Sequence, residues 1–286
     1  MPGRLPSWLR RKVGRGRDVS AVRKVLRSNG LHTVCEEAGC PNLGECFNHH
    51  VATFMILGDT CTRDCRFCGV RKGIPSAPRD DEPESVAKAV QALNLKHVVI
   101  TSVTRDDLED KGATWFARTI KAVRDRVPLV TIEILVPDFK GNPKALDTVL
   151  AQGPDVFNHN VETVPRLYGE VRHGAEYSRS LSLLADASAK KARTKSGLML
   201  GLGETWSEVE QVMIDLRNSG VTMLTMGQYL KPNKRAYPVA EYLDPKVFKE
   251  YGRLAGNMGF ENVFSGPLVR SSYHAAEQVR RDIKNA

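Results

Sequence analysis

The chain has 286 residues, of which 41% are hydrophobic and 26% are charged, and this is enough apolar material for a full core. Its formal net charge of +9 favours acidic partners such as nucleic acid, an anionic membrane or an acidic protein, and it also serves solubility. No apolar run is long enough to span a membrane, and the first residues lack the apolar core of a secretion signal. We therefore expect a cytoplasmic protein in a reducing compartment, where its six cysteines are metal ligands rather than disulfides.

Strand-like apolar runs alternate with helix-like stretches along most of the chain. The expected strands are, in order, 51–57, 97–102, 129–136, 156–161, 197–200 and 223–229. The expected helices are 84–93, 113–126, 143–151, 180–193, 205–218 and 245–258. Thr205 or Ser207 is expected to cap the fifth helix, and Gly259 is expected to end the sixth.

This alternation predicts an α/β fold with a parallel sheet and right-handed crossovers. Polar residues recur at the carboxyl ends of the expected strands, which is where barrels carry their active sites. We therefore expect a partial (β/α)6 TIM-type barrel over residues 51–262, with an N-terminal extension over 1–50 and a C-terminal extension over 263–286. A doubly wound open sheet fits the same pattern.

The cysteines fall into two groups of three, and none lies after residue 68. Cys61, Cys65 and Cys68 have the spacing C-x3-C-x2-C in a loop that follows the first expected strand. Three thiolates on a four-iron cluster leave one iron open, and an open position is typical of a catalytic metal centre. Zinc is the alternative, with a fourth ligand from a nearby histidine such as His32, His49 or His50.

The second group, Cys35, Cys40 and Cys46, has the spacing C-x4-C-x5-C in a segment rich in glycine and proline. Taken alone, it also fits a zinc loop. Beside the first group, it indicates an auxiliary cluster that needs a fourth ligand or a substrate.

The first group, in the sequence CTRDCRFC with Phe67 before the last cysteine, resembles the radical S-adenosylmethionine superfamily. Together with CEEAGCPNLGEC, it resembles the lipoyl synthase family. Further blocks match that family in order, from about Pro6 to His274: PSWLR, LHTVCEE, SVTRDDL, PDF, NHNVETV, SGLMLGLGET, GQYLKP and GPLVRSSYHA.

The resemblance implies two 4Fe–4S clusters and S-adenosylmethionine as cofactors. Cys61, Cys65 and Cys68 then hold the reducing cluster, and Cys35, Cys40 and Cys46 hold the auxiliary cluster. The RSSY block implies a serine as the fourth auxiliary ligand, which is Ser272 by alignment with the family pattern, with Ser271 as the second choice. Residues that resemble the family's contacts to S-adenosylmethionine are Asn158, Asn160, Gly201, Gly203 and Glu204.

The activity implied by the resemblance is the insertion of two sulfur atoms at C6 and C8 of an octanoyl-lysine on a carrier protein. The implied carriers are the E2 subunits of 2-oxoacid dehydrogenases and the glycine cleavage H protein. The implied electron donor is reduced ferredoxin or flavodoxin, and neither nucleic acid nor a membrane span is implied. The positive charge of the chain then has an acidic carrier domain as its partner.

Two other classes of protein fit part of this sequence. Another radical enzyme with an auxiliary cluster, such as a methylthiotransferase or a biotin synthase-like sulfurtransferase, is disfavoured by the combination of C-x4-C-x5-C with RSSY. A zinc or nucleic-acid binding module would account for the cysteines and the charge, but it leaves the barrel-like body unexplained.

The chain departs from the family pattern after its TRDDL block. The family usually has Asp-Gly-Gly there, whereas this chain has Asp110, Lys111 and Gly112. If the turn requires a positive φ at residue 111, a lysine is costly there.

Overall fold

The computed structural model describes residues 5–10, 17–48 and 52–280. His49, His50 and Val51, the first residue of the expected strand 51–57, lie outside these ranges. The chain divides into two compact units, which are described separately. The N-unit comprises Lys12–Asp64 and Gly69–Phe157, and the C-unit comprises Met1–Arg11, Cys65–Cys68 and Asn158–Ala286.

The N-unit contains a sheet with the strand order β1, β2, β5, β6. Its strands are β1 (His32–Thr33), β2 (Thr53–Ile56), β5 (His97–Ser102) and β6 (Thr131–Leu135). β1 is antiparallel to β2, and the other neighbours are parallel, with Thr53 opposite Val99 and Val99 opposite Glu133. A separate short parallel pair joins β3 (Thr60–Cys61) to β4 (Arg71–Lys72). β7 (Val156–Asn158) begins in this unit.

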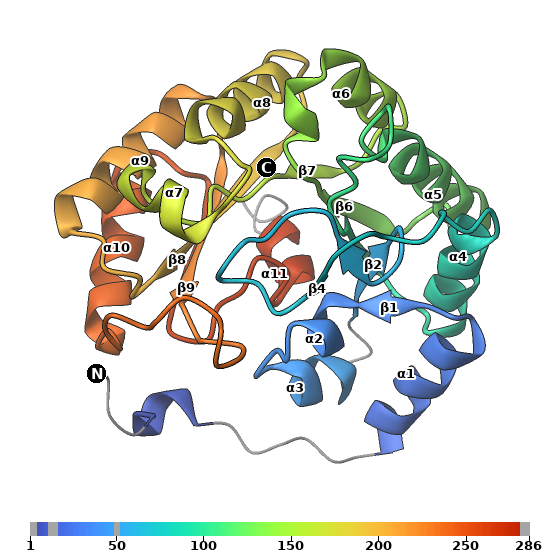
Figure 1. The fold of residues 1–286 in the computed structure, drawn as a ribbon, viewed down its shortest axis with the longest axis horizontal. Helices are drawn as coiled ribbons and strands as arrows, with labels where there is room; N and C mark the ends of the chain where they lie inside the picture. The colour runs from blue at the N-terminus through green and yellow to red at the C-terminus, as the bar shows by residue number, and fades with distance from the viewer. Residues whose placement is uncertain (1–4, 11–16, 49–51, 281–286) are drawn as a thin grey trace. The chain divides into compact units, whose positions relative to one another are not determined.

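Three helices of the N-unit follow its parallel strands. They are α4 (Glu82–Ala92), α5 (Ala113–Arg126) and α6 (Pro143–Leu150), with a 3-10 turn, η2, at Phe139–Gly141. α5 packs between α4 and α6, as Figure 1 shows for these labelled helices. Asn142 caps α6 by accepting the backbone N–H of Lys144, and Pro143 occupies the first helical position, where its missing N–H costs nothing.

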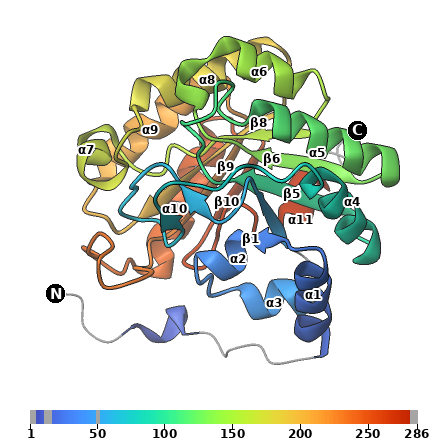
Figure 2. The same cartoon turned by 45° about the vertical axis from the view of Figure 1, so that its right-hand side comes forward.

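The amino-terminal part of the N-unit is helical. It consists of α1 (Arg17–Ser28), α2 (Val34–Glu37) and α3 (Leu43–Asn48), and α1 packs against α3 (Figure 2). Val19, Val22 and Leu26 are buried at the spacing of one helix face, whereas Lys24 and Arg27 on the opposite face are exposed. α1 is therefore a helix with one buried apolar face and one solvated, positively charged face.

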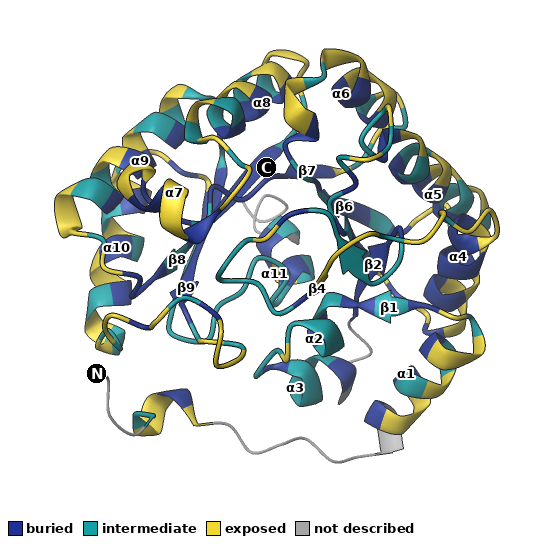
Figure 3. Cartoon of the chain, viewed as in Figure 1, coloured by how far each residue is buried: buried dark blue, intermediate teal, exposed yellow. Residues whose placement is uncertain are grey.

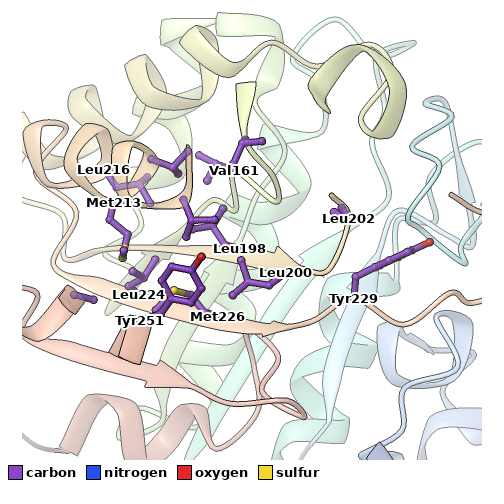
Figure 4. Close-up of a cluster of buried hydrophobic side chains, with 14 of the residues drawn as sticks. Val161, Leu198, Leu200, Leu202, Met213, Leu216, Leu224, Met226, Tyr229 and Tyr251 are labelled. Atoms are coloured by element: carbon purple, nitrogen blue, oxygen red, sulfur yellow. The ribbon is translucent and has the colours of Figure 1, made fainter. Parts of the chain in front are cut away.

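The C-unit contains three parallel strands in the order β8 (Thr194–Leu200), β9 (Met223–Gln228), β10 (Asn262–Ser265). Its helical segments are η1 (Ser7–Leu9), η3 (Pro165–Leu167), α7 (Tyr168–Val171), α8 (Tyr177–Ala189), α9 (Trp206–Asn218), α10 (Pro245–Asn257) and α11 (Ala275–Arg280). Leu198 and Leu200 of β8 belong to one apolar core with Met213 of α9 and Tyr251 of α10 (Figure 4). In Figure 3, β8 and β9 are almost entirely buried, whereas α8, α9 and α10 combine buried with exposed positions.

The mostly parallel α/β class is confirmed, and the strand 97–102 and the helix 113–126 have the expected bounds. Thr205, rather than Ser207, caps α9, in a capping box with Glu208. The expected strand 156–161 is shorter, because β7 ends at Asn158, and the expected strand 197–200 is longer, because β8 begins at Thr194. β10 was not expected. No helix among the described residues is long and apolar enough to cross a membrane.

Candidate active site

Cys35, Cys40 and Cys46 lie on two short helices and the turn between them, all in the N-unit. Thr33 caps α2, in which Cys35 is buried, and the backbone N–H of Cys40 donates to the carbonyl of Cys35 at 3.0 Å. The N–H of Cys46 donates to the carbonyl of Asn42 at 2.9 Å, which starts the turn of α3. Helix and turn hydrogen bonds thus fix the backbone of all three cysteines.

The three thiols of this group interact electrostatically. Burial, and then the charge of Cys40, raise the pKa of Cys35 to about 11. Burial, and then Cys35 and Cys40, raise the pKa of Cys46 to about 12. Three such thiols give up their protons together only to a cation that compensates the charge, which is the chemistry of an iron–sulfur core. The donor set therefore fits a cluster, although no three His, Cys, Asp or Glu side chains among the described residues are arranged as a metal-ligand group.

Cys61 follows β2 and lies in β3 of the N-unit. Its sulfur accepts the backbone N–H groups of Thr104, at 3.4 Å, and of Arg63, at 3.5 Å. Thr104 belongs to the loop after β5, so residues from two loops surround this sulfur. Amide hydrogen bonds to a thiolate stabilise its negative charge and tune the potential of a bound cluster.

Arg63, two residues after Cys61, is buried and is bound by two carboxylates. Its Nε donates to Asp106 Oδ2 at 2.7 Å, and its Nη2 donates to Asp138 Oδ1 at 2.5 Å. Burial alone would lower the pKa of Arg63, but the hydrogen bonds that it donates to Asp106 and Asp138 raise it. These contacts tie the segment after Cys61 to the loops that follow β5 and β6. The sequence interpretation assigned Arg63 no role.

Cys65 and Cys68 belong to the C-unit. Cys65 forms an isolated bridge with Arg172, and the N–H of Arg66 donates to the carbonyl of Val171 at 2.8 Å. The N–H of Cys68 donates to the carbonyl of Cys65 at 3.2 Å. The described structure thus provides a fixed backbone for each cysteine of the C-x3-C-x2-C motif, with Cys61 in one unit and Cys65 and Cys68 in the other.

Asn160 is at the centre of a hydrogen-bonded group in the C-unit. Its Nδ2 donates to Glu162 Oε1 at 3.1 Å, and its Oδ1 accepts the hydroxyl of Ser271 at 2.7 Å. Burial raises the pKa of Glu162, and Arg172, Asn160 and Arg270 oppose that shift. The group borders a cavity of about 90 Å³ that is also lined by Gly197, Met199 and Arg270.

Asn158 and Asn160, two of the expected contacts to S-adenosylmethionine, lie in different surroundings. Asn160 and the acidic Glu162 face the same cavity, and Glu162 was not among the expected site residues, although the NHNVETV block contains it. Asn158 is buried at the end of β7. His159, between the two asparagines, instead pairs with Ser180, with Nε2 and Oγ 3.0 Å apart.

The glycine-rich turn after β8 is held by its own glutamate. Glu204 accepts the backbone N–H of Gly201, at 2.5 Å, and of Leu202, at 2.9 Å. Gly201 has φ +96° and Gly203 has φ +108°. A side chain at Gly201 would overlap the Gln228 side chain and the carbonyl of Glu241, so both backbone angle and close packing require glycine there. This arrangement shapes the end of β8, next to residues that line the cavity.

The comparisons with known proteins agree along nearly the whole chain. The model of the radical SAM superfamily matches residues 55–216, and the model of the N-terminal domain of lipoyl synthase matches residues 2–40. A lipoyl synthase from Methylococcus capsulatus is 55% identical over 280 residues, which cover 97% of this chain and 87% of the relative. A lipoyl synthase from Caldicellulosiruptor saccharolyticus is 52% identical over 282 residues, which cover 98% of this chain and 99% of the relative.

The chain belongs to the lipoyl synthase family. Membership of the radical SAM superfamily brings with it a 4Fe–4S cluster and S-adenosylmethionine. Among solved structures, the methylornithine synthase PylB resembles this lipoyl synthase family member with a TM-score of 0.59 at 15% identity, over 86% of this chain and 69% of that one. Coproporphyrinogen III oxidase from Escherichia coli resembles it with a TM-score of 0.52 at 16% identity, over 71% of this chain and 51% of that one. At these identities the likeness shows the fold alone.

Proposed function

We propose that this chain is a lipoyl synthase, which inserts two sulfur atoms at C6 and C8 of an octanoyl chain amide-linked to a lysine of a carrier protein. Identities of 52% and 55% over nearly the whole chain support this proposal. The observation that carries it is the presence of two separate cysteine groups, one of them gathered in the N-unit within mutual electrostatic reach. A single cluster would leave three of the six thiols unexplained.

In this proposal Cys61, Cys65 and Cys68 hold the reducing cluster, and Cys35, Cys40, Cys46 and Ser272 hold the auxiliary cluster. When bound, the clusters supply the electron that cleaves S-adenosylmethionine and the sulfur that enters the product. The octanoyl C–H bonds are not acidic, so no side-chain base can remove their hydrogens and a radical is required. One molecule of S-adenosylmethionine is consumed for each hydrogen removed, which makes two for each lipoyl group.

The residues of the chain position these groups. Asn158, Asn160, Gly201, Gly203 and Glu204 are the proposed contacts to S-adenosylmethionine, and Glu162 joins them because it faces the same cavity as Asn160. Ser272 is preferred over Ser271 as the fourth auxiliary ligand by alignment with the RSSY block of the family, and the hydroxyl of Ser271 donates to Asn160.

The proposed partners follow from this activity. They are octanoylated lipoyl domains of 2-oxoacid dehydrogenase E2 subunits, the glycine cleavage H protein, and reduced ferredoxin or flavodoxin as electron donor, in the cytoplasm. The exposed Lys24 and Arg27 of α1 contribute to the net charge of +9, which attracts an acidic carrier domain. The match of the N-terminal lipoyl synthase model, which includes Cys35 and Cys40, disfavours the rival radical enzymes.

The test is an anaerobic assay with an octanoyl-lysyl peptide, S-adenosylmethionine and a reductant, read by mass spectrometry. We expect a lipoyl-lysyl peptide, together with 5′-deoxyadenosine. Cys35→Ala is expected to cleave S-adenosylmethionine without forming the lipoyl peptide, whereas Cys65→Ala is expected to do neither. Cleavage of S-adenosylmethionine by the wild-type chain with no sulfur in the peptide would argue for a different substrate.

A further inference from the structure

Lys195 is a charged residue in the interior of a parallel strand. It lies in β8, and its side chain is fully buried. Lysine is almost never fully buried unless its ammonium group is paired, because removing the charge from water is costly. An ammonium group in the core of the C-unit therefore requires a hydrogen-bond acceptor that stabilises its charge.

One partner of this ammonium group is the RSSY segment. Lys195 Nζ donates to the carbonyl oxygen of Ser271 at 2.6 Å. A hydrogen bond from an ammonium group is stronger than one between neutral groups, and more so in a buried setting. The hydroxyl of the same serine donates to Asn160 Oδ1 at 2.7 Å. Ser271 is thus held at its backbone by β8 and at its side chain by Asn160.

Two glycines let this segment lie directly on the sheet of the C-unit. A Cβ at Gly227 of β9 would overlap the carbonyl oxygen of Val269, and a Cβ at Gly197 of β8 would lie 3.0 Å from Ser271 Oγ. The N–H of Gln228 also donates to the carbonyl of Pro267 at 3.2 Å. The absence of side chains at these two strand positions therefore makes room for the segment that precedes Ser272.

Ser271 and Ser272 are the two central residues of a tight turn. The turn is closed by the N–H of Tyr273, which donates to the carbonyl of Arg270 at 2.9 Å. A turn of this kind changes type when its central peptide rotates, and that rotation turns the carbonyl of the first central residue over. Here that carbonyl belongs to Ser271 and is the one that Lys195 binds. This rotation pivots the planar peptide about the line between the Ser271 and Ser272 Cα atoms, so it changes the φ of Ser272 and with it the direction of the Ser272 side chain.

We propose that Lys195 is a positioning residue for the fourth ligand of the auxiliary cluster. It holds the central peptide of the turn in one orientation and so presents Ser272, while Ser271 serves as the second anchor of the turn and not as a ligand. This inference rests on the proposed role of Ser272. It assigns a function to a buried charge that the radical chemistry does not otherwise use.

The test compares Lys195→Met with Lys249→Met, in which an exposed lysine of α10 is replaced. The first measurement is hydrogen exchange of the backbone amides of residues 270–274 in purified chain before any cluster is loaded. We expect exchange at Tyr273 to accelerate at least about tenfold in Lys195→Met, because the turn loses the hydrogen bond from Lys195 to the carbonyl of Ser271. Exchange at Tyr273 should be unchanged in Lys249→Met. Unchanged exchange in Lys195→Met would overturn the proposal that Lys195 holds the central peptide of the turn.

The second measurement is the Mössbauer and electron paramagnetic resonance spectrum after anaerobic reconstitution. Lys195→Met is expected to alter the auxiliary-cluster signal, while the signal of the reducing cluster and the affinity for S-adenosylmethionine stay within about twofold of wild type. An auxiliary signal identical to wild type would overturn the positioning role. Lys195→Arg, which keeps a charged donor, is expected to restore part of the lost signal.

Ser271→Ala and Ser272→Ala distinguish the proposed anchor, Ser271, from the proposed ligand, Ser272. These two variants also test the proposal if Lys195→Met does not fold. Ser271→Ala is expected to accelerate exchange at Tyr273 before cluster loading, whereas Ser272→Ala is expected to change only the auxiliary signal after loading. If Ser272→Ala leaves that signal unchanged, the proposed ligand is wrong, whatever the exchange data show for Lys195. If Ser271→Ala leaves exchange unchanged, its anchor role is wrong.

Discussion

Arg63 and Asp138 form a buried ion pair in the N-unit, with Nη2 and Oδ1 2.5 Å apart. Arg63 lies between the first two cysteines of the C-x3-C-x2-C motif, and Asp138 begins the 3-10 turn after β6. Asp106, after β5, binds the same guanidinium at 2.7 Å. The loop that carries Cys61 is therefore fastened to the ends of two neighbouring strands, so that the residue proposed as the first cluster ligand is held in place by the protein itself.

Replacement of Arg63 by methionine should destabilise the chain strongly. It removes the guanidinium that pairs with the fully buried carboxylate of Asp138, and breaking a buried pair in this way costs about 3–5 kcal/mol. Arg118→Met, which breaks an exposed pair with Asp80, is the control and should cost at most about 1 kcal/mol. Urea unfolding of the purified variants measures both. Equal effects of the two replacements would contradict the bracing role of Arg63.

Lys111 occupies the position at which the sequence raised the question of a positive φ, and its φ is +58°. Its ammonium group donates to the carbonyls of Asp106 and Leu108, both at 3.0 Å. Lys111→Gly relieves the strained angle but loses these bonds, so we expect a stability within about 1 kcal/mol of wild type. Lys111→Met keeps the strain and loses the bonds, and it should be less stable by about 1–2 kcal/mol. Thermal unfolding that ranks Lys111→Met at or above Lys111→Gly would show that the bonds contribute nothing.

The contacts of Glu208 at the start of α9 should stabilise the folded chain at neutral pH and lose this contribution in acid. The hydrogen bond from Arg166, and then the capping contacts with Thr205, lower the pKa of Glu208 from 4.5 to about 2. A carboxylate with a lowered folded-state pKa stabilises the protein above its unfolded pKa and loses that contribution as pH falls through its folded pKa. Glu208→Gln should therefore be less stable than wild type at pH 7, by about 0.5 kcal/mol for this exposed pair, and the difference should shrink between pH 4.5 and 2. Urea titrations across this range measure it, and a difference that grows with acidity would refute the assignment.

Ser272→Ala should separate the two clusters in function. We expect it to keep the reducing cluster and the binding of S-adenosylmethionine, and to lose the lipoyl product. Ser271→Ala, a matched change one residue earlier, should retain some product, because it weakens an anchor without removing a ligand. The measurements are 5′-deoxyadenosine and lipoyl peptide in the same reaction. Wild-type product formation by Ser272→Ala would rule this serine out.

The elements that the sequence located well are those whose apolar residues follow one simple period. Residues 113–126 expose one face and bury the other, and residues 97–102 form a short run buried on both faces, so both had the expected bounds. The start of β8 was missed because Lys195 and Ser196 are polar, and only tertiary partners such as Ser271 make their burial favourable. The end of β7 was placed too late, because Val161 is apolar and buried like the residues of the strand, although the strand itself ends at Asn158.

The same physical reasons decide which residues of the candidate site the sequence could single out. Cysteine spacing is a local signal, and it identified both groups without knowledge of the fold. Arg63 and Glu162 were missed because their importance comes from residues distant in sequence: Asp138 for the first, and the cavity shared with Ser271 for the second. A charged residue inside a cysteine motif, or at the end of a buried strand, is the signal that would have singled them out.

The most direct test follows the sulfur atoms themselves. The chain is reconstituted anaerobically with sulfide of a heavy isotope, freed of unbound sulfide, and given an octanoyl-lysyl peptide with S-adenosylmethionine for one turnover. If Cys35, Cys40 and Cys46 hold a cluster that donates its sulfur, mass spectrometry will find both sulfur atoms of the lipoyl peptide heavy in the wild type and no lipoyl peptide with Cys35→Ala. A product that carries only light sulfur, or its formation by Cys35→Ala, would contradict this source of sulfur.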